Sequence, residues 1–337
     1  NDARFFYEVD QKKPLAARVE DLKNVTFQKD IGSYYDKIQR VAAVLTNDAD
    51  ARRACELCKC DLTTDMVKEF TDLQGLIGGL YARAQGESEA VAQAIYDHYK
   101  PLSMEDSIPS TPAGQRLALA DKLDTLHECF RIGMIPTGSK DPFALRRAAQ
   151  GVVKILIEGS LDSKLLDLVS NDSLKAFFED RVRYYFREAR GHAYDEVNAA
   201  ITCGWSDLKD LAARLEALKA VRPTADFEPL AASFKRIRNI LEQAAFTGGA
   251  IDITSFADDS ERNLHSAMTS LNLRGLGYRE QLERIATLRP AVDKFFDTVL
   301  VNAPEPLIRQ NRLALLHHLR SEFSRIADFS EIITSSN

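Results

Sequence analysis

Residues 117–130 have the sequence LALADKLDTLHECF, in which the apolar side chains recur at steps of three and four. This spacing places the apolar side chains on one face of an α-helix and the charged ones on the other. Residues 145–157 show the same period, as do residues 66–81, where we expect one continuous buried stripe. Alternation typical of β-strands is rare, and NVTF at residues 24–27 is at most a short extended piece. The sequence therefore predicts an all-α protein.

The composition sets the broad class of the protein. With 337 residues, of which 45% are hydrophobic and 28% charged, the chain has the length for two packed cores and the balance of a soluble globular protein. No apolar run reaches the roughly 18 residues of a membrane span. Five unevenly spaced cysteines favour a reducing compartment over a disulfide framework. The opening NDARFFYEVDQKKPL lacks a starting Met and a signal sequence, so we expect a piece of a longer cytoplasmic chain.

The charge distribution narrows the choice of partners. The formal net charge is −6, and neither half of the chain is basic. An acidic background opposes non-specific coating of DNA, so we expect no DNA partner. A nucleic-acid surface would have to be a local basic patch, which suits a structured RNA contacted at a few points.

Segments rich in proline, glycine or polar residues divide the helical pattern. Residues 99–114 contain three prolines and form a loop long enough to be functional or to wrap a neighbouring element. Within residues 133–147 one helix ends and another begins, with Asp141 as the predicted N-cap and Pro142 at the first helical position. Residues 221–229 form a polar break between helices of the second half.

A change of composition near the middle of the chain marks the predicted domain boundary. Ser, Asp and Asn accumulate in residues 158–173, as they do in loops between periodic segments. No repeat of fixed period accompanies the change. We therefore predict two helical domains, residues 1–165 and residues 166–337.

The stretch CELCKCDLTTDMVKEFTDLQG, residues 55–75, raises the question of a metal site. Cys55 and Cys58 have the spacing of one zinc knuckle, and Cys60 follows closely. A structural zinc site needs four such ligands, and no second knuckle exists in the sequence. Small apolar cysteines packed on a helix explain the pattern better, so we predict no metal site.

Acidic residues in the same stretch are also ambiguous. Asp61, Asp65, Glu69 and Asp72 would share one face of a continuous helix, as metal ligands or as a solvated, ion-paired row. We favour the solvated row, and the pair at residues 121 and 124 has the same ambiguity. A metal phosphohydrolase of the His-Asp type would need a His-Asp dipeptide, which the sequence lacks. Because no nucleophile and base can be assembled from local motifs, we predict no catalytic residue.

Basic residues mixed with amides occur twice in the second half of the chain. FKRIRNIL at residues 234–241 and LIRQNRL at residues 307–313 place arginine, lysine and asparagine together. Arginine binds phosphates and stacks on unpaired bases, and asparagine contacts base edges, as in the recognition of single-stranded RNA. A solvated helix face with internal ion pairs explains the pattern equally well. The candidate RNA contacts are Lys235, Arg236, Arg238, Asn239, Arg309, Asn311 and Arg312.

Long ordered phrases resemble one family, the β subunit of the bacterial two-subunit (α2β2) glycyl-tRNA synthetase. The resemblance extends almost from end to end of the chain and is more specific than any metal-like spacing. It rests on FFYEVDQKKPLAARVEDLKNVTFQKDIGS (5–33), KCDLTTDMVKEFTDLQGLIGGLYA (59–82), ALADKLDTLHECFRIGMIPTGSKDPFALRRAAQGVVKI (118–155), FKRIRNIL (234–241) and VDKFFDTVLVNAPEPLIRQNRLALLHHLRSEFSRIADFS (292–330).

The resemblance implies an HD-like helical domain followed by a helical anticodon-binding domain of the arginyl-tRNA synthetase type. In the first domain, Lys59 and Asp61 stand in KCD where a metal-binding His-Asp would be sought. The family's catalytic centre, which uses ATP and Mg²⁺, lies in the α subunit. The implied partners are therefore the α subunit, glycine tRNA and the N-terminal domains of β, which this sequence lacks, and no cofactor is expected in this part of the chain.

The resemblance also implies a second tRNA contact, in the first domain. We select Lys140, Arg146 and Arg147 for it, because they lie at the start of a helix whose positive end suits phosphate. A structural alternative is that Arg146 and Arg147 attach their helix to Asp121 or Asp124. Two other functions stay open: an HD-type metal-dependent phosphohydrolase and a non-catalytic helical scaffold.

Overall fold

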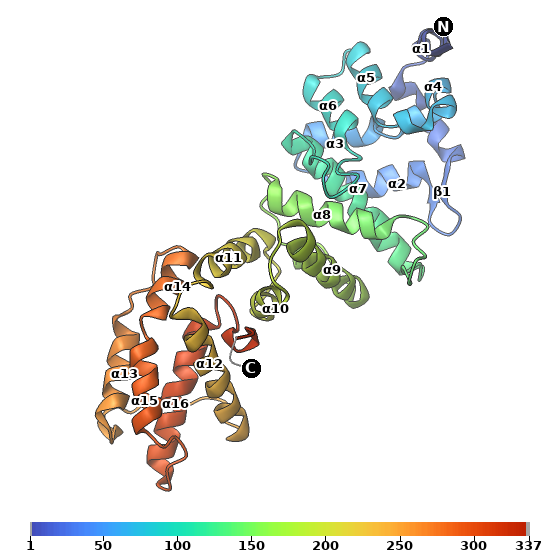
Figure 1. The fold of residues 1–337 in the computed structure, drawn as a ribbon. Coiled ribbons are helices and arrows are strands. Elements are labelled where there is room, and N and C mark those ends of the chain that lie inside the picture. The colour runs from blue at the N-terminus through green and yellow to red at the C-terminus, as the bar shows by residue number, and fades with distance from the viewer. Residues whose placement is uncertain (1, 335–337) are drawn as a thin grey trace. The chain divides into compact units, whose positions relative to one another are not determined.

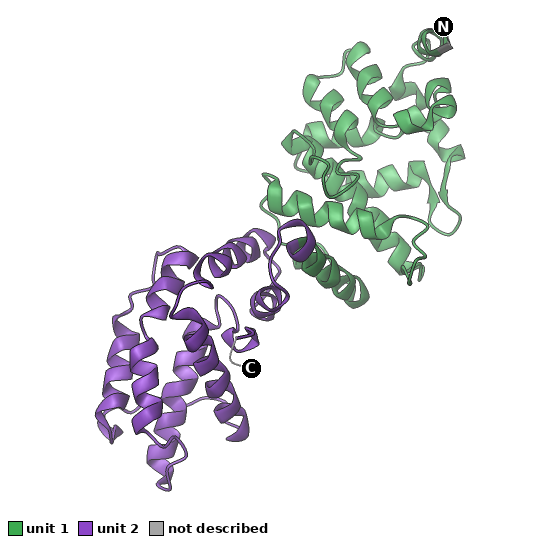
Figure 2. Ribbon diagram, viewed as in Figure 1, with its two compact units in different colours: residues 1–185 green, residues 186–337 purple. Residues whose placement is uncertain are grey.

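The computed structural model describes residues 2–334 and divides the chain into two compact units, residues 1–185 and residues 186–337 (Figure 2). The described residues of the two units together form sixteen α-helices and a single two-stranded sheet, which confirms the all-α fold (Figure 1). The division between compact units falls after the domain boundary expected at 165/166, because the helix of residues 172–184 packs on helices that precede it. The domain assignment itself stays a prediction.

Unit 1 contains nine helices among the described residues and a small antiparallel hairpin. The strands β1 (Thr26–Gln28) and β2 (Gly32–Ser33) include part of the expected extended piece. The helices are α1 (Asp2–Asp10), α2 (Tyr34–Val44), α3 (Ala49–Leu57), α4 (Asp65–Glu69), α5 (Leu76–Ala84), α6 (Glu89–Asp97), α7 (Pro112–Arg131), α8 (Leu145–Glu158) and α9 (Asp172–Tyr184).

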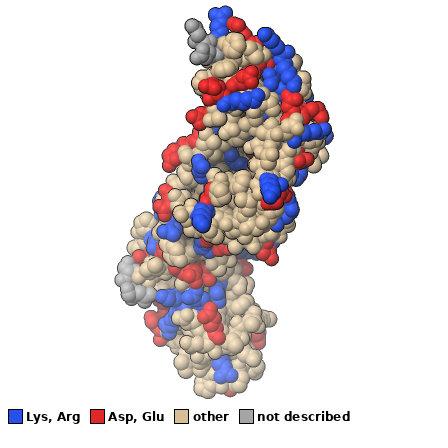
Figure 3. All heavy atoms as spheres, turned by 90° about the vertical axis from the view of Figure 1, so that its right-hand side faces the viewer, with Lys and Arg blue, Asp and Glu red and all other residues tan. Residues whose placement is uncertain are grey.

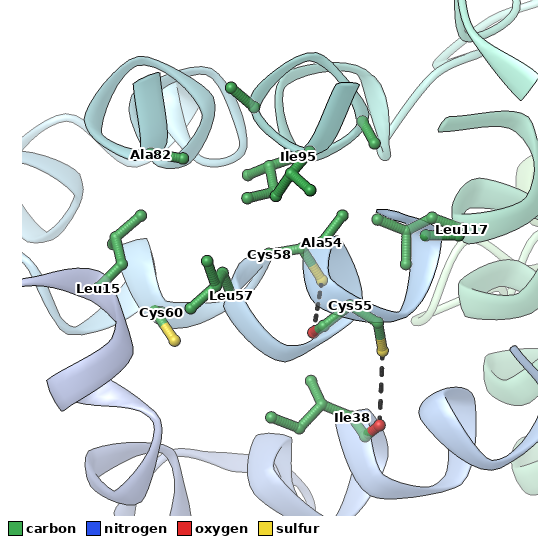
Figure 4. Packing of buried hydrophobic residues seen from close by; sticks show 14 of the residues in the cluster. Leu15, Ile38, Ala54, Cys55, Leu57, Cys58, Cys60, Ala82, Ile95 and Leu117 are labelled. Atoms are coloured by element: carbon green, nitrogen blue, oxygen red, sulfur yellow. Dashed lines mark hydrogen bonds between the residues drawn. The ribbon is translucent and has the colours of Figure 1, made fainter. Parts of the chain in front are cut away.

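The core of unit 1 forms around α3, which packs against α2, α6 and α7. Cys55, Cys58 and Cys60 are at most 1% exposed and lie among leucine, isoleucine and alanine side chains (Figure 4). The thiol of Cys55 donates to the carbonyl of Ile38 at 3.5 Å, and that of Cys58 to the carbonyl of Cys55 at 3.4 Å. Burial also raises the pKa of the Cys60 thiol, which disfavours the thiolate that a metal would bind. The expected packing role of these cysteines is confirmed.

The predicted continuous stripe in residues 66–81 is wrong. The segment is broken into α4, a short 3-10 turn and α5, and both Phe70 and Leu80 are exposed. Gly75, at φ +80°, lies at the break, where its missing Cβ allows a left-handed backbone. The periodicity was real within each short helix, but it did not extend across the turn.

The start of α8 also differs from the prediction. The helix begins at Leu145, with Ala144 in a left-handed conformation before it, and not at Pro142. Asp141 still caps the helix, because its carboxylate accepts from the amides of Leu145 at 2.7 Å and Arg146 at 3.0 Å. The capping residue therefore lies in the loop, four residues before the start of the helix, and not directly before it.

The loop of residues 99–114 wraps a neighbouring element, as one of its two expected roles. Lys154, on α8, donates to the carbonyls of Met104 at 2.5 Å and Asp106 at 2.7 Å. Lys122, on α7, donates to the carbonyl of Tyr99 at 2.9 Å. These two lysines fix the loop onto the helices by bonding three of its backbone carbonyls.

Unit 2 is built from seven helices in its described part, which extends to residue 334. An aromatic group formed by Phe227, Phe234, Phe323 and Phe329 fills its core between α12 and α16, with ring centroids 5.2–5.8 Å apart. The break at residues 221–229 is confirmed between α11 and α12. The helices are α10 (Tyr194–Thr202), α11 (Leu208–Val221), α12 (Phe227–Gln243), α13 (Asp259–Ser270), α14 (Tyr278–Ala286), α15 (Arg289–Thr298) and α16 (Pro306–Phe323). No helix within residues 2–334 has the length and apolarity needed to cross a bilayer.

Candidate functional site

Unit 1 encloses a group of charged and aromatic side chains that we call the Lys59 cluster: Lys37, Lys59, His98, Tyr99 and Asp121. Lys37 lies on α2, Lys59 two residues after α3, His98 and Tyr99 directly after α6, and Asp121 on α7. These four helices pack against one another, and their packing brings the five side chains together. Lys37, Lys59 and His98 are at most 2% exposed.

The ammonium of Lys59 is the centre of the cluster. It lies 3.0 Å from Nε2 of His98 and donates to Oδ2 of Asp121 at 3.2 Å. The same ammonium sits 4.0 Å from the ring centroid of Tyr99, a cation–π contact. Lys37 pairs with the other carboxylate oxygen of Asp121 at 3.3 Å. Each charge in this buried place therefore has an opposite charge or a polar acceptor beside it.

His98 is held as the neutral imidazole. Its Nδ1 donates to the carbonyl of Ile95 at 2.5 Å, which leaves the lone pair of Nε2 to accept from the ammonium of Lys59. Burial, followed by the repulsion from Lys59, lowers the pKa of His98 to about 3. The imidazole is therefore an acceptor throughout the physiological pH range.

The charged forms of Asp121 and Lys59 stabilise each other. Burial alone would raise the pKa of Asp121, but the ammonium groups of Lys37 and Lys59 hold it well below its usual range. Burial likewise pulls down the pKa of Lys59, and the Asp121 carboxylate more than offsets it. The cluster is thus a largely buried ion network, which Lys37 extends to Asp124.

The chemistry of the Lys59 cluster differs from that of a metal site. An imidazole nitrogen and a carboxylate oxygen are donors that a transition metal would use, but the ammonium of Lys59 lies between them. Among the described residues no three His, Cys, Asp or Glu side chains are arranged to hold a metal ion. An ammonium at this point also repels a cation. The arrangement therefore joins four helices electrostatically.

Asp61 corrects the expectation of a solvated row of acids. Its side chain is fully buried, and Oδ2 accepts from the amides of Gly75 at 2.6 Å and Gly78 at 3.1 Å. Burial raises the pKa of the Asp61 carboxyl to about 6, against the lowering effect of the two amides. Asp65, by contrast, is partly exposed and pairs with Lys68 at 3.4 Å. Asp61 thus holds the turn that breaks the helical pattern.

The alternative in which Arg146 and Arg147 attach α8 to acids of α7 is wrong. Asp124 pairs instead with Lys37 at 3.0 Å and with Arg40 at 2.7 Å. Asp121 is occupied by the Lys59 cluster. Within residues 2–334 neither Arg146 nor Arg147 forms an ion pair, and Arg147 is exposed together with Lys140. The three predicted cations around the start of α8 therefore stay available to a partner.

The four predicted contacts on α12 have different environments. Arg238 pairs with Glu331 at 2.6 Å, as the ion-pair alternative expects. Arg236 is exposed and its guanidinium lies 4.1 Å from the ring centroid of Phe296 on α15. Lys235 and Asn239 form no ion pair or side-chain hydrogen bond among the described residues, and Asn239 is exposed. Arg236 is thus a stacked cation with its outer face open.

The predicted contacts on α16 divide between the interior and the surface. Asn311 is buried, and its amide bonds the backbone N–H and C=O of Asp252 at 2.8 and 2.9 Å. Arg312 bonds the buried Glu261 and the carbonyl of Leu300, so its donors are used inside the unit. Arg309 is exposed and, in the described part of the chain, has no acidic partner. Only Arg309 of these three presents a free cation.

Three of the cations that a partner could contact on unit 2 are therefore Lys235, Arg236 and Arg309. On the face shown in Figure 3, basic and acidic side chains are interspersed and do not form one continuous basic field. This distribution agrees with the net charge of −6 and favours contact at separate points.

Comparison with known proteins shows the family. A family model described as glycyl-tRNA synthetase beta subunit matches residues 1–202, more than half of the chain. The chain belongs to this family of beta subunits. A glycine–tRNA ligase beta subunit from Acidobacterium capsulatum is 49% identical, over 99% of this chain and 53% of its own. Relatives with the same description from Citrifermentans bemidjiense and Ralstonia nicotianae are each 40% identical over 98% of this chain and 52% of their own.

This member of the beta-subunit family spans about half the length of the curated relatives it matches. The similarity to these relatives extends over both compact units of the chain. The family model matches unit 1 and the first helix of unit 2. The resemblance seen in the sequence is confirmed at the level of the family.

Sequence reasoning missed most of the Lys59 cluster in this beta subunit. His98 and Tyr99 were not selected, and Lys59 was noted only as a replacement within KCD. Lys59 is 39 residues from His98 and 62 from Asp121, so no local spacing could join them. A usable signal was that Asp121 has no basic residue three or four positions away on α7, where an ion-pair partner on the same helix would lie.

Proposed function

We propose that this chain is the tRNA-binding part of a glycyl-tRNA synthetase β subunit, and that it supports the ATP-dependent attachment of glycine to tRNA(Gly) in the α subunit. Membership of the beta-subunit family supports the proposal. The observation that carries it is the set of exposed cations without acidic partners in the described chain: Arg236, Arg309, Lys140 and Arg147. Contact with a phosphate stabilises such groups most, because no internal ion pair has to be broken first.

In this proposal the two units have separate roles. Unit 2 acts as an anticodon-binding domain, in which Lys235, Arg236 and Arg309 contact the RNA and Arg238, Asn311 and Arg312 shape the surface behind them. Unit 1 acts as an HD-like domain that contacts another part of the tRNA near Lys140. ATP and Mg²⁺ belong to the α subunit, and the assembled enzyme works in the cytoplasm.

Binding of tRNA by the 337-residue chain tests the proposal. Filter binding compares glycine tRNA with the same tRNA carrying a changed anticodon. Because each lost base contact costs roughly 1–3 kcal/mol, we expect about tenfold weaker binding or more for the changed tRNA. The assembled two-subunit enzyme provides a parallel measurement.

Two outcomes contradict the proposal in different ways. Equal binding of both tRNAs would leave a basic surface without anticodon recognition. No binding by the chain or by the assembled enzyme would leave a helical scaffold. A metal phosphohydrolase would be indicated instead by bound transition metal in elemental analysis together with phosphatase turnover.

A further inference from the structure

Unit 2 contains a pocket that none of the selected tRNA contacts lines. It has a volume of about 550 Å³, and its lining residues come from the end of α13, the loop of residues 271–277, α14, α16 and the residues directly after α16. This volume is within the roughly 300–1,000 Å³ of small-ligand sites. The pocket therefore has room for one small group of a ligand.

The floor of the pocket is apolar and its rim is polar. The half-buried Met268 and Leu273 form its apolar floor together with Leu271 and Phe323, which are buried in the unit. Arg274 and Arg325 line its rim and are exposed. Apolar side chains beside guanidinium groups suit a base that packs against them and a phosphate that is neutralised.

The polar groups of the rim are free for a ligand. Within residues 2–334, Arg274 and Arg325 form no ion pair or side-chain hydrogen bond, and the same holds for Asn272 and His318. Glu322 is the single acidic residue that lines the pocket, opposite two arginines. The charge balance therefore favours an anionic ligand, and Asn272 and His318 can bond the polar edge of a base.

The loop that forms one wall is fixed before any ligand arrives. Asn272 and Gly275 have left-handed backbones, at φ +49° and +77°. Nη1 of Arg284 donates to the carbonyls of Leu271 at 3.0 Å and Asn272 at 3.1 Å, and Nη2 of the same arginine pairs with Glu280 at 3.0 Å. Gln281 donates to the carbonyl of Leu276 at 2.7 Å. A wall held in this way loses little entropy on binding.

We propose that this pocket binds one unpaired nucleotide of the tRNA, with its base against the apolar floor and its phosphate at Arg274 and Arg325. The proposal rests on the tRNA-binding function argued above, and it adds a recognition point separate from Lys235, Arg236 and Arg309. A free mononucleotide has the same chemistry. The tRNA is favoured because the rim is open and exposed, which suits a nucleotide that stays attached to a larger polymer.

The test compares single arginine variants of the 337-residue chain in filter binding to glycine tRNA. Arg274→Ala and Arg325→Ala each remove a proposed phosphate contact, so each should weaken binding on the order of tenfold. Arg279→Ala is the matched control, since this exposed arginine of α14 pairs with Glu283 and lies outside the pocket. The control should change binding less than about twofold. Circular dichroism melting verifies that each variant is folded.

A second arm identifies the source of the nucleotide. A photoreactive residue introduced at Thr269, an exposed lining position, should crosslink to a loop nucleotide of the tRNA, mapped by primer-extension stops. If the wild type binds glycine tRNA and Arg274→Ala and Arg325→Ala bind it equally well, the nucleotide-binding role of the pocket is wrong and the proposed function is unaffected. Absence of tRNA binding by the wild type would overturn both. If free nucleoside monophosphates saturate the pocket while the variants bind tRNA as the wild type does, the ligand of the pocket is a free nucleotide.

Discussion

Lys59 stabilises unit 1 by closing an ion network, and removal of its charge should show this. Lys59→Met keeps the length of the side chain but leaves the buried Asp121 carboxylate with Lys37 alone. Breaking a buried pair by removing one partner typically costs about 3–5 kcal/mol. We expect a loss of about 3 kcal/mol in the free energy of unfolding, measured with urea. Lys68→Met, at an exposed lysine nearby, should change it by less than about 0.5 kcal/mol.

The neutral state of His98 makes the fold sensitive to acid. Its pKa is about 3 in the folded chain and about 6.5 in an unfolded one, so the unfolded chain binds the proton first. The stabilisation is complete above pH 6.5 and is lost as the pH falls from 6.5 towards 3, on the order of 5 kcal/mol in all. His98→Gln should therefore flatten the loss of unfolding free energy between pH 7 and pH 5. An equally steep loss in the variant would assign the acid sensitivity to other groups.

Asp61 has the opposite sign in an overlapping window. Its pKa of about 6 exceeds the usual value of 3.8, so the folded chain takes up the proton first and gains stability as the pH falls from 6 to 3.8. The effects of His98 and Asp61 on the free energy of unfolding therefore partly cancel between pH 6 and pH 3.8, and the single variant is needed to separate them.

At this scale the sequence predicted what depends on local composition. The packing of Cys55, Cys58 and Cys60 followed from their small apolar neighbours and the missing second knuckle. The partners of Lys59 and the burial of Asp61 did not follow, because both depend on contacts between α3, α5, α6 and α7. A charged residue in the sequence is expected at the surface unless its distant partner is known.

At the scale of elements, α5 and α6 pack closely because Gly79 has no side chain. A Cβ at residue 79 would lie 2.5 Å from Cβ and 2.8 Å from Cα of Tyr96. Gly79→Ala adds about 1 kcal/mol of helix propensity, but the required separation of the helices should cost more. We expect a net loss of roughly 1–2 kcal/mol in the free energy of unfolding, measured with urea. Leu80→Ala, at an exposed position of the same helix, should have a smaller effect, and a stabilised Gly79→Ala variant would contradict the close approach.

The elements also show where periodicity predicts well. The long helices α7 and α8 lie where the three- and four-residue steps placed them, since one stripe faces one core over several turns. The prediction failed between residues 66 and 81, where Asp61 binds the amides of Gly75 and Gly78 and a turn replaces the helix. A tertiary hydrogen bond decided the local structure there, and no count of apolar positions could show it.

At the scale of the whole molecule, the all-α class followed from the sequence and the candidate site did so only in part. Periodicity and family resemblance determine the class and the family. The environments of the seven selected residues of unit 2 depend on α13, α15 and the C-terminal segment, which supply Glu261, Phe296 and Glu331. The pocket beside Arg274 arises where three helices meet, so its sequence carries no motif.

A chain with a net charge of −6 should bind tRNA through individual cations and not through its overall charge. Arg236→Ala removes one cation that stacks on Phe296, and we expect weaker binding of glycine tRNA with a salt slope reduced by about 0.7–0.9 per lost phosphate contact. Lys23→Ala changes the net charge equally, but Lys23 pairs with Glu20 in unit 1 and should leave the slope unchanged. Filter binding across a salt series measures both. Arg236→Lys should keep the slope and still weaken binding, because an ammonium lacks the planar face that stacks on a base. Equal effects of the alanine variants at 236 and 23 would show that overall charge, and not position, governs the interaction.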